Sequence, residues 1–296
     1  MSPLHEAISY ATPPALLIGN GINRFSAQTS SSWENLLDEL ASGQGLSLSP
    51  AEMAEMSNTE FFDVLDLARP QDDKLNLQKE FCRLMATWEP AAHHERIVRW
   101  AERKNTPIIT VNFDESLSRA VDADFVRSKN RFTDFYPWGC YFSSQDVSRP
   151  REAFAIWHAH GMMRYSRSIR LGLTHYMGAV QRARSWVYAR QDGLHRATRL
   201  GVGEWRGADT WLDILFHSPL MIFGFGFRKD ENFFRWLFLE RARLHKIAPH
   251  LKQKTWFVEV QSDAIQHRKP FFERLGVDLV TVETYQDIYA AALWDL

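Results

Sequence analysis

Short apolar runs alternate with helical patterns along this chain, and this alternation limits the fold more than any other feature. The runs are short and rich in β-favouring side chains, which is typical of buried strands in a parallel sheet. They occupy residues 14–19, 107–112, 153–159, 219–224, 255–260 and 277–282. The sequence therefore predicts an α/β fold, with a doubly wound, mostly parallel, Rossmann-like sheet of about six strands.

The longest helical region lies between the first two predicted strands. Residues 50–103 carry almost continuous helical patterns, more than an ordinary crossover contains, and Ser49 and Pro50 would begin them. We therefore expect one domain over 1–296 with a helical insertion over 35–105. A second helical segment is expected over 175–216, including a long helix from 176 to about 199. Residues 122–152 are expected to be irregular.

The first run ends in a glycine turn, Gly19-Asn20-Gly21. Two glycines after a strand let the backbone turn sharply and approach a pyrophosphate, as in dinucleotide-binding units. The third glycine of that fingerprint is absent, because Asn23-Arg24-Phe25 follows. A tight turn without a ligand remains the alternative. We expect a polar loop over 19–32, then a helix from about Trp33 that a hydroxyl over 30–32 caps.

Three further predicted strands also end in polar or glycine motifs. Asn112 and Asp114 follow the second strand, His160-Gly161 the third, and Gly224-Phe225-Gly226 the fourth. The carboxyl ends of parallel strands meet at one edge of a sheet, where ligands bind near a switch in strand order. The sequence thus predicts one ligand crevice formed by four strand ends.

Composition and charge exclude several classes of protein. The formal net charge is −1, so no global positive field attracts nucleic acid, and direct nucleic-acid binding is not expected. No apolar run approaches the roughly 20 residues that a membrane helix needs. The first residues lack an export pattern, and Cys82 and Cys140 are the only cysteines. We therefore expect a cytoplasmic protein without contact to a membrane.

Six motifs occur in an order that resembles a known family. They are Leu17-Ile-Gly-Asn-Gly-Ile-Asn23, Ser32-Trp33-Glu34-Asn-Leu-Leu, Thr110-Val-Asn-Phe-Asp114, His160-Gly161, Ser168-Ile-Arg-Leu-Gly-Leu-Thr-His-Tyr176, and Gly224-Phe-Gly-Phe with Asp230. This set resembles the sirtuin-like (SIR2-like) domain family, specifically the zinc-free branch of bacterial anti-phage defence NAD hydrolases. The likeness spans most of the chain, whereas residues 35–100 match by position alone.

The departures from sirtuin deacylases point to the same branch. Deacylases hold a structural zinc with four cysteines, which this chain cannot supply, and they have alanine where Asn20 stands. The resemblance implies an NAD glycohydrolase that releases nicotinamide and ADP-ribose, with NAD as substrate, no metal and no zinc. It also implies an abortive-infection effector in antiviral defence.

Two residues are the candidates for catalysis. The nicotinamide–ribose bond breaks through an oxocarbenium-like state, so the site must position a nucleophile and stabilise charge. Asn112 can hold a water or a ribose hydroxyl through its amide, or it can cap the following helix. His160 can take a proton near neutral pH. His158 competes with it, but the family's His-Gly pair favours His160.

Other residues are candidates for holding NAD. Glycines would line the phosphates, Asn23 and Arg24 would contact a phosphate, and acidic side chains would bind ribose hydroxyls. Asp230 is expected to cap the helix over 231–246 instead, and Trp33 is given no role. The predicted NAD-binding set is Gly19, Asn20, Gly21, Asn23, Arg24, Asp114, Gly224, Gly226 and Glu259.

Two other functions stay open at this point. The fold could hold NAD or ADP-ribose as a signal without cleaving it, or it could transfer ADP-ribose to a macromolecule. An enzyme that drains NAD must be restrained, so we expect homo- or hetero-oligomers or a partner protein to control it. Related systems use an ATPase, an Argonaute-like protein or a nucleotide-sensing subunit.

Overall fold

One eight-stranded sheet lies at the centre of the computed structural model, which describes residues 3–8, 10–25, 32–46, 52, 55–70, 75–128 and 132–296. The strand order is β3-β4-β5-β2-β1-β6-β7-β8. The strands are β1 (Ala15–Ile18), β2 (Ile108–Thr110), β3 (Asp124–Val126), β4 (Tyr141–Ser143), β5 (Ile156–His158), β6 (Leu220–Phe223), β7 (Thr255–Val260) and β8 (Asp278–Val282). The predicted α/β class and mostly parallel sheet are confirmed.

The six strands from β5 to β8 in this order run parallel to one another. Numbered along the chain, they have the order 3-2-1-4-5-6, which dinucleotide-binding sheets also have. The strand order changes direction at β1, where Leu17 pairs with Ile109 of β2 and with Ile222 of β6. The carboxyl ends of β1 and β6 therefore flank the switch point.

Each of the six predicted strands overlaps one of these parallel strands, but the prediction of about six strands is too low. Strands β3 and β4 lie within 122–152, which we expected to be irregular, and both pair antiparallel. Each has three residues, too few for a periodicity of two to stand out among the neighbouring aromatic residues. Their pairing depends on contacts with segments that are distant in the sequence.

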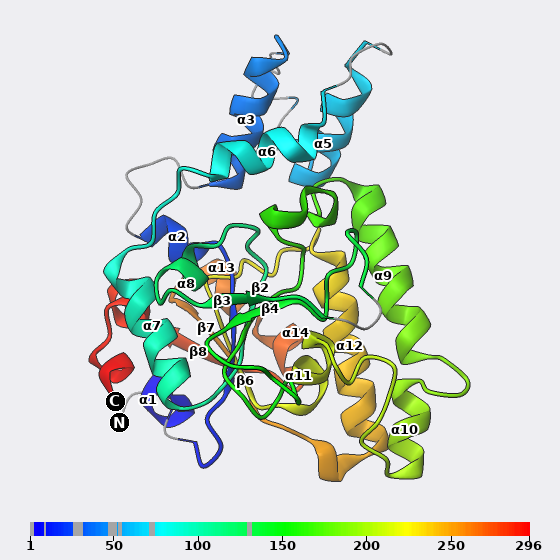
Figure 1. Cartoon of the computed structure of the whole chain (residues 1–296). Helices are drawn as coiled ribbons and strands as arrows, with labels where there is room; N and C mark the ends of the chain where they lie inside the picture. Colours follow the sequence, from blue (N-terminus) through cyan, green and yellow to red (C-terminus); the bar gives the residue numbers. More distant parts are fainter. Residues whose placement is uncertain are drawn as a thin grey trace.

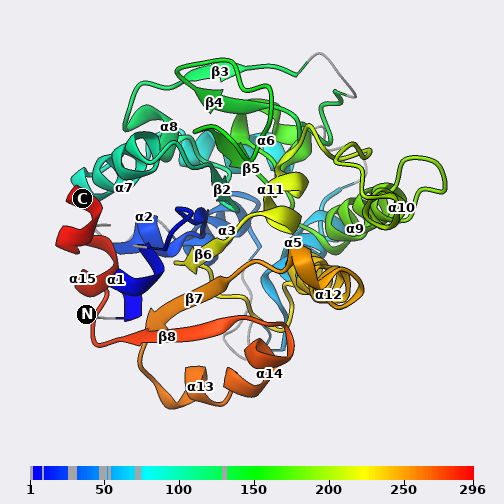
Figure 2. The same cartoon turned by 90° about the horizontal axis from the view of Figure 1, so that it is seen from below.

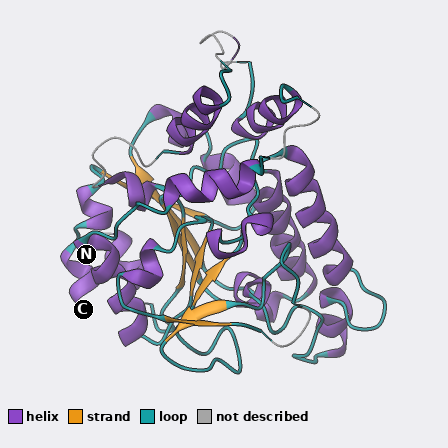
Figure 3. Ribbon diagram, turned by 45° about the horizontal axis from the view of Figure 1, so that its top comes forward, coloured by secondary structure: helices purple, strands orange, loops and turns teal. Residues whose placement is uncertain are grey.

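Helices cover both faces of the sheet (Figures 2 and 3). On one face, α1 (Pro3–Ile8), α7 (Ala92–Arg103) and α15 (Gln286–Tyr289) pack against Leu16 and Ile18 of β1. On the other, side chains of α9 (Leu173–Val187), α10 (Leu194–Leu200), α11 (Trp211–His217) and α12 (Asn232–Ile247) belong to one apolar cluster with Leu17. Alternate residues of β1 thus reach opposite faces, as the pleat of a strand requires.

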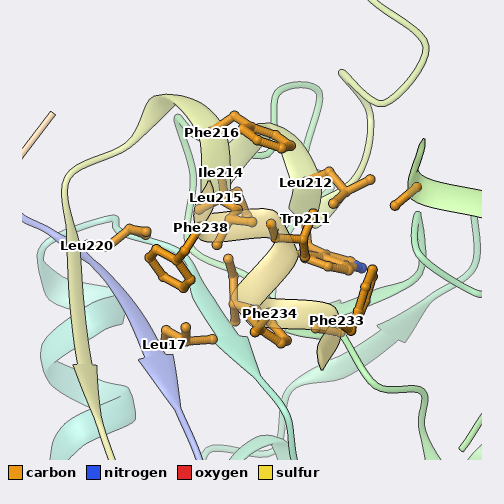
Figure 4. Close-up of a cluster of buried hydrophobic side chains, with 14 of the residues drawn as sticks. Leu17, Trp211, Leu212, Ile214, Leu215, Phe216, Leu220, Phe233, Phe234 and Phe238 are labelled. Carbon is orange, nitrogen blue, oxygen red and sulfur yellow. The ribbon is translucent and has the colours of Figure 1, made fainter. Parts of the chain in front are cut away.

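The second face has a dense apolar core. Figure 4 shows that side chains of α11, among them Trp211 and Leu215, meet Phe234 and Phe238 of α12 above Leu17 of β1. The Trp211 and Phe234 rings are stacked with centroids 5.8 Å apart. This packing fixes α12 on the sheet. It therefore also fixes Glu231, the residue directly before the helix.

A third apolar cluster joins α3 (Trp33–Gly43), α5 (Asn58–Leu67) and α6 (Leu77–Met85). These helices lie together beyond one end of the sheet (Figure 1). The predicted hydroxyl cap of α3 is confirmed, because Ser32 Oγ accepts from the Asn35 amide at 3.0 Å. The predicted cap at Ser49 and Pro50 lies outside the described residues. Helix α7, although within 35–105, packs on the sheet.

Three helix predictions need correction. The predicted loop over 19–32 contains helix α2 (Gly21–Phe25), which begins directly at the glycine turn. The predicted long helix over 176–199 is two helices, because α9 ends at Val187 and α10 starts after Gly193. A Cβ on Gly193 would lie 2.4 Å from the Ala189 oxygen, so the chain bends there. The sequence also predicts a final helix over 285–293, whereas α15 spans only Gln286–Tyr289.

The remaining elements are short. They are α8 (Ser116–Arg119), α13 (Asp263–Gln266), α14 (Lys269–Arg274), and the 3-10 helices η1 (Met163–Ser168), η2 (Pro249–Leu251) and η3 (Ala292–Asp295).

Candidate functional site

A pocket of about 470 Å³ opens at the carboxyl ends of the parallel strands. This volume lies within the range of small-molecule pockets. Its wall includes residues that directly follow β1, β2, β5 and β6 in the sequence, together with a residue near the end of β7. Seven residues of the predicted site line it, namely Asn20, Gly21, Arg24, His160, Gly224, Gly226 and Glu259. Gly19, Asn23, Asn112 and Asp114 are not among the described residues that line it.

The glycines at the switch point let two turns touch. The Gly21 amide donates to the Gly224 oxygen at 2.8 Å. A Cβ on Gly19 would lie 2.4 Å from that oxygen, and one on Gly21 would lie 2.6 Å from the Gly224 Cα. Gly224 itself has φ +63°, which favours glycine. Gly226 is different, since its Cβ would meet nothing closer than 3.5 Å. The presence of glycine at 19, 21 and 224 is therefore explained by the contact between the two turns and by backbone conformation, without a ligand.

Asn23 belongs to a buried chain of hydrogen bonds. The Ala91 amide donates to His94 Nδ1 at 3.0 Å, so the proton of the neutral ring is on Nε2, which lies 3.0 Å from Asn23 Oδ1. Burial, with help from the neighbouring His93, lowers the pKa of His94 to about 4. Asn23 Nδ2 in turn donates to Asn20 Oδ1 and to Asp114 Oδ2, both at 2.8 Å.

This chain of hydrogen bonds shows how two residues of the predicted site, Asn23 and Asp114, are placed. Asn23 is 6% and Asp114 is 3% exposed. Asp114 Oδ1 also accepts from the Ser116 amide at 3.0 Å, at the start of α8. The structure thus places Asn23 and Asp114 in a scaffold that orients the Asn20 amide at the pocket wall.

Asn112 lies next to the pocket wall but is itself buried. Its Nδ2 donates to the Gly19 oxygen at 3.4 Å, and its Oδ1 is buried without a partner among the described residues. Val111, the preceding residue, lines the pocket. Buried polar atoms nearly always have partners, so this amide oxygen keeps an open acceptor position, although Asn112 does not line the pocket.

His158 and His160 have different surroundings, although both are buried. His158 Nδ1 donates to the Asn112 carbonyl at 2.8 Å, and burial lowers the pKa of His158. His158 does not line the pocket, whereas His160 does. Of these two histidines, His160 is therefore the one that lies at the pocket.

His160 is held by a carboxylate that the sequence analysis did not single out. Its Nε2 lies 3.3 Å from Glu231 Oε2. Because the carboxylate accepts, Nε2 donates and Nδ1 is the acceptor atom of the neutral ring. Nδ1 is buried without a partner among the described residues. The rings of Tyr176 and Phe234 meet the imidazole edge to face, at 5.1 and 5.2 Å.

Glu231 also corrects the expected cap of α12. We predicted Asp230 for this role, but Glu231 is the N-cap, and its Oε1 accepts from the Phe234 amide at 3.4 Å. Asp230 lines the pocket instead, with its Oδ1 3.6 Å from Arg228 Nε. Since two adjacent acidic residues precede the helix, the sequence offered both as caps and could not choose between them.

The turn after His160 is built around Gly161. Gly161 has φ +98°, and a Cβ there would lie 2.1 Å from the Ser168 oxygen. The Met162 amide donates to Ser168 Oγ at 2.9 Å, and the Arg170 amide donates to the His160 oxygen at 3.1 Å. The segment that follows the strand therefore fastens His160 in place.

The outer wall of the pocket carries both positively and negatively charged side chains. Arg24 is exposed and makes no ion pair within 4.0 Å in the part of the chain that the structure describes. Burial acts to raise the pKa of Glu34, but hydrogen bonds from its backbone and Asn58, with the positive charges of Arg24 and Arg228, bring it below its usual value. A phosphate group would meet Arg24 on this side, and also Arg228, which already lies beside the carboxylates of Glu34 and Asp230.

The far end of the pocket contains Glu259, Tyr285 and Tyr289. Burial raises the pKa of Glu259, although the Val260 amide donates to its Oε1 at 2.9 Å. The Tyr289 hydroxyl is buried without a partner among the described residues, and burial raises its pKa. Neither tyrosine was predicted as a pocket residue, and neither were Trp33 and Tyr176, which also line the wall. An isolated aromatic residue in a sequence carries no signal that separates a core position from a pocket position.

The described residues contain neither a metal-ligand cluster nor a helix that could cross a membrane. There, no group of three or more His, Cys, Asp or Glu side chains is arranged to hold a metal ion. Cys82 and Cys140 are buried and free, and burial raises the pKa of the Cys82 thiol to about 12. None of the described helices combines the length and the apolar character needed to cross a membrane.

Comparison with known proteins adds no relative: no protein-family model matches the chain, and no curated protein matches it. The geometry alone therefore indicates the chemistry. The pocket combines an imidazole held by a carboxylate, an unpaired amide oxygen beside the wall, and cations at its edge. Such a set can bind a phosphate-bearing ligand and accept a proton from a hydroxyl or water.

Proposed function

We propose that this chain is a SIR2-like NAD glycohydrolase, which hydrolyses NAD to nicotinamide, ADP-ribose and a proton. The strand order 3-2-1-4-5-6 supports a doubly wound, Rossmann-like arrangement, and the pocket lies where such sheets bind dinucleotides. The zinc-free character is part of this proposal, and NAD is its substrate.

The residues would divide the work as follows. Arg24 and the turn that carries Gly224 and Gly226 would hold the phosphates, and Glu259 would accept from the adenosine ribose. Asn112 Oδ1 would accept a hydrogen bond from water or a ribose hydroxyl. As the bond to nicotinamide breaks, water would attack the ribose C1′ and His160 Nδ1 would take its proton. Glu231 would hold the imidazolium that results, as a carboxylate does in other acid–base pairs.

One observation carries the proposal: His160, held by Glu231, lines the pocket at the switch point of the sheet. A histidine with only a core role would be expected to have both ring nitrogens paired or to face away from a cavity. His160 instead has an unpaired Nδ1 and a place in the pocket wall.

The test is an assay of free nicotinamide after incubation of the purified full chain with NAD. Parallel incubations contain EDTA, or a lysate of phage-infected cells as a source of activating partners. Nicotinamide and ADP-ribose in equal amounts, unaffected by EDTA, would support the proposal. No nicotinamide under any of these conditions would refute it, and ADP-ribose found on a macromolecule would indicate ADP-ribosyl transfer.

A second candidate is a module that binds NAD or ADP-ribose without cleaving it. The burial of Asn112 favours this function, since its amide is 2% exposed and bonded to the Gly19 oxygen. Calorimetric titration with ADP-ribose separates the two. Binding without nicotinamide release, unchanged when Asn112 is replaced, would favour the binding module.

The biological setting is the remaining part of the proposal. An enzyme that depletes NAD suits an abortive-infection effector in the cytoplasm, and it needs restraint before infection. We propose that oligomerisation or a partner protein, such as an ATPase, an Argonaute-like protein or a nucleotide-sensing subunit, supplies that control. Co-purification of a tagged chain before and after phage infection tests this, and an unchanged monomer in both samples would contradict it.

A further inference from the structure

A second pocket, of about 550 Å³, lies where the connection between α9 and α10 meets the end of α12. It shares no lining residue with the pocket at the strand ends. Five of its lining residues carry a positive charge, and none is acidic. These five are Arg190, Arg196, Arg199, Arg243 and Lys246.

Four of these five cations form no ion pair with the described residues. Arg243 pairs with Glu240. For the other four, no ion pair within 4.0 Å occurs in the described part of the chain. Like charges gathered around one concave surface repel each other and raise the local concentration of anions.

Helix stability does not account for the cluster. Cations stabilise the last turn of a helix, which suits Lys246 in α12 and Arg199 in α10. Arg196, however, lies in the first turn of α10, where the helix dipole disfavours a positive charge. Arg190 lies in the turn before that helix.

One buried carboxylate, that of Glu240, holds three of the lining side chains in place. Glu240 is 1% exposed and accepts from the Tyr188 hydroxyl at 2.8 Å, with His195 Nε2 at 3.4 Å. Burial acts to raise its pKa, but hydrogen bonds from His195, Tyr188 and Arg243 lower it below the usual value. One buried carboxylate thus fixes side chains from three segments, which reduces the entropy lost when a ligand binds.

The rim of the pocket is partly apolar. Tyr188, Leu200 and Ile247 line it, and they are 48%, 60% and 51% exposed. A flat ring laid against the tyrosine and the two aliphatic side chains would remove apolar surface from water, beside the cations.

We propose that this pocket is a binding site for a nucleotide, with its phosphates held by Arg196, Arg199 and Arg190 and its base against Tyr188. Arginine is suited to phosphate because its planar guanidinium forms paired hydrogen bonds. The pocket's volume matches a small molecule, and its mixed polar and apolar lining matches the two halves of a nucleotide.

The position of the site relative to the first pocket follows from α12. Glu231, at the N-cap, lines the first pocket, and Lys246, near the other end, lines the second. With a rise of 1.5 Å per residue, the two lie roughly 22 Å apart along the axis. Helix α9 also contributes Tyr176 to one pocket and Val187 to the other. Nucleotide binding here does not depend on NAD being the ligand at the first pocket.

The test uses the full chain and four probes: ADP, inorganic pyrophosphate, adenosine and a 12-nucleotide single-stranded DNA. Calorimetry at 150 mM salt measures affinity, and hydrogen–deuterium exchange locates the contact. Arg196→Glu with Arg199→Glu is compared with a matched variant, Lys269→Glu with Arg274→Glu, which makes the same charge change on α14. We expect ADP to protect residues 187–200 and 243–247.

The expected result is at least a tenfold loss of ADP affinity at this segment in the α10 variant and less than a twofold loss in the α14 variant. ADP should bind at least tenfold more tightly than pyrophosphate or adenosine. Equal losses in both variants, or no protection of residues 187–200 by ADP, would overturn the proposal. Tighter binding of the DNA than of ADP would also overturn it, in favour of a nucleic-acid contact.

Discussion

His160 Nε2 lies 3.3 Å from Glu231 Oε2, while the other oxygen of Glu231 caps helix α12. One carboxylate therefore ties the imidazole at the pocket to a helix that is anchored on the sheet by Phe234 and Phe238. Because the packing of α12 sets the position of the carboxylate, it also sets the orientation of the imidazole.

Glu231→Gln should lower kcat for nicotinamide release by roughly tenfold to hundredfold, a part of what general base catalysis supplies. The amide keeps an acceptor for the Phe234 amide but loses the charge that stabilises a protonated ring. We therefore expect KM and the melting temperature to change little. Steady-state kinetics measure kcat and KM, and a thermal melt measures the melting temperature. A fall of the melting temperature that accompanies the fall of kcat would assign Glu231 to capping alone.

His160→Ala and Asn112→Ala should each reduce nicotinamide release by at least a hundredfold. His160 supplies the proton acceptor, and Asn112 supplies an amide beside the wall. Circular dichroism should show an unchanged fold in each variant. Retained activity in both variants would refute the assignment of the site.

Gly224→Ala and Gly201→Ala separate backbone strain from steric overlap. Both glycines have positive φ, +63° and +67°, but a Cβ on Gly201 meets nothing within 4 Å, whereas one on Gly224 lies 2.6 Å from the Tyr289 hydroxyl. Gly201→Ala should lower the free energy of unfolding by about 1 kcal/mol, and Gly224→Ala by at least about 2 kcal/mol. Urea denaturation measures both.

Tyr289→Phe supplies a further check of that overlap. Because the hydroxyl is buried without a partner among the described residues, its removal alone should be nearly neutral or stabilising. In the Gly224→Ala background it should recover part of the lost stability, since the overlapping oxygen is gone. Additive effects of the two substitutions would show that the two side chains do not meet.

Stability should fall as the pH drops from about 6.5 to about 4. Burial lowers the pKa values of His94 and His245 to about 4 in the folded chain, while an unfolded histidine titrates near 6.5. The unfolded state thus binds more protons in this window, and each histidine contributes a slope of up to about 1.4 kcal/mol per pH unit. Urea denaturation at pH 7.5, 6.5, 5.5 and 4.5 measures it. A His94→Gln variant with an undiminished slope would contradict the assignment.

Sequence patterns located the parallel strands because each strand is a local apolar run. They also placed the polar motifs at the strand ends, and this is why Asn20, Arg24, His160 and Glu259 meet in one pocket. Strands β3 and β4 escaped prediction because three residues carry too little periodicity, and their pairing depends on distant segments. The break between α9 and α10 escaped because the helical pattern continues across Gly193.

The sequence by itself determined the order of the six parallel strands along the chain, and which residues stand at their ends, because these depend on neighbours along the chain. The sequence already favoured His160 over His158, and the structure places His160 in the pocket wall. Tertiary structure alone decided that Asn23 and Asp114 form a buried scaffold and that Glu231 is the partner of His160. Hydrogen bonds between residues 71 and 91 positions apart decide those roles, and no local pattern records such pairs. For Gly19, Gly21 and Gly224, the turn was visible in the sequence, but the contact between the two turns that requires these glycines was not.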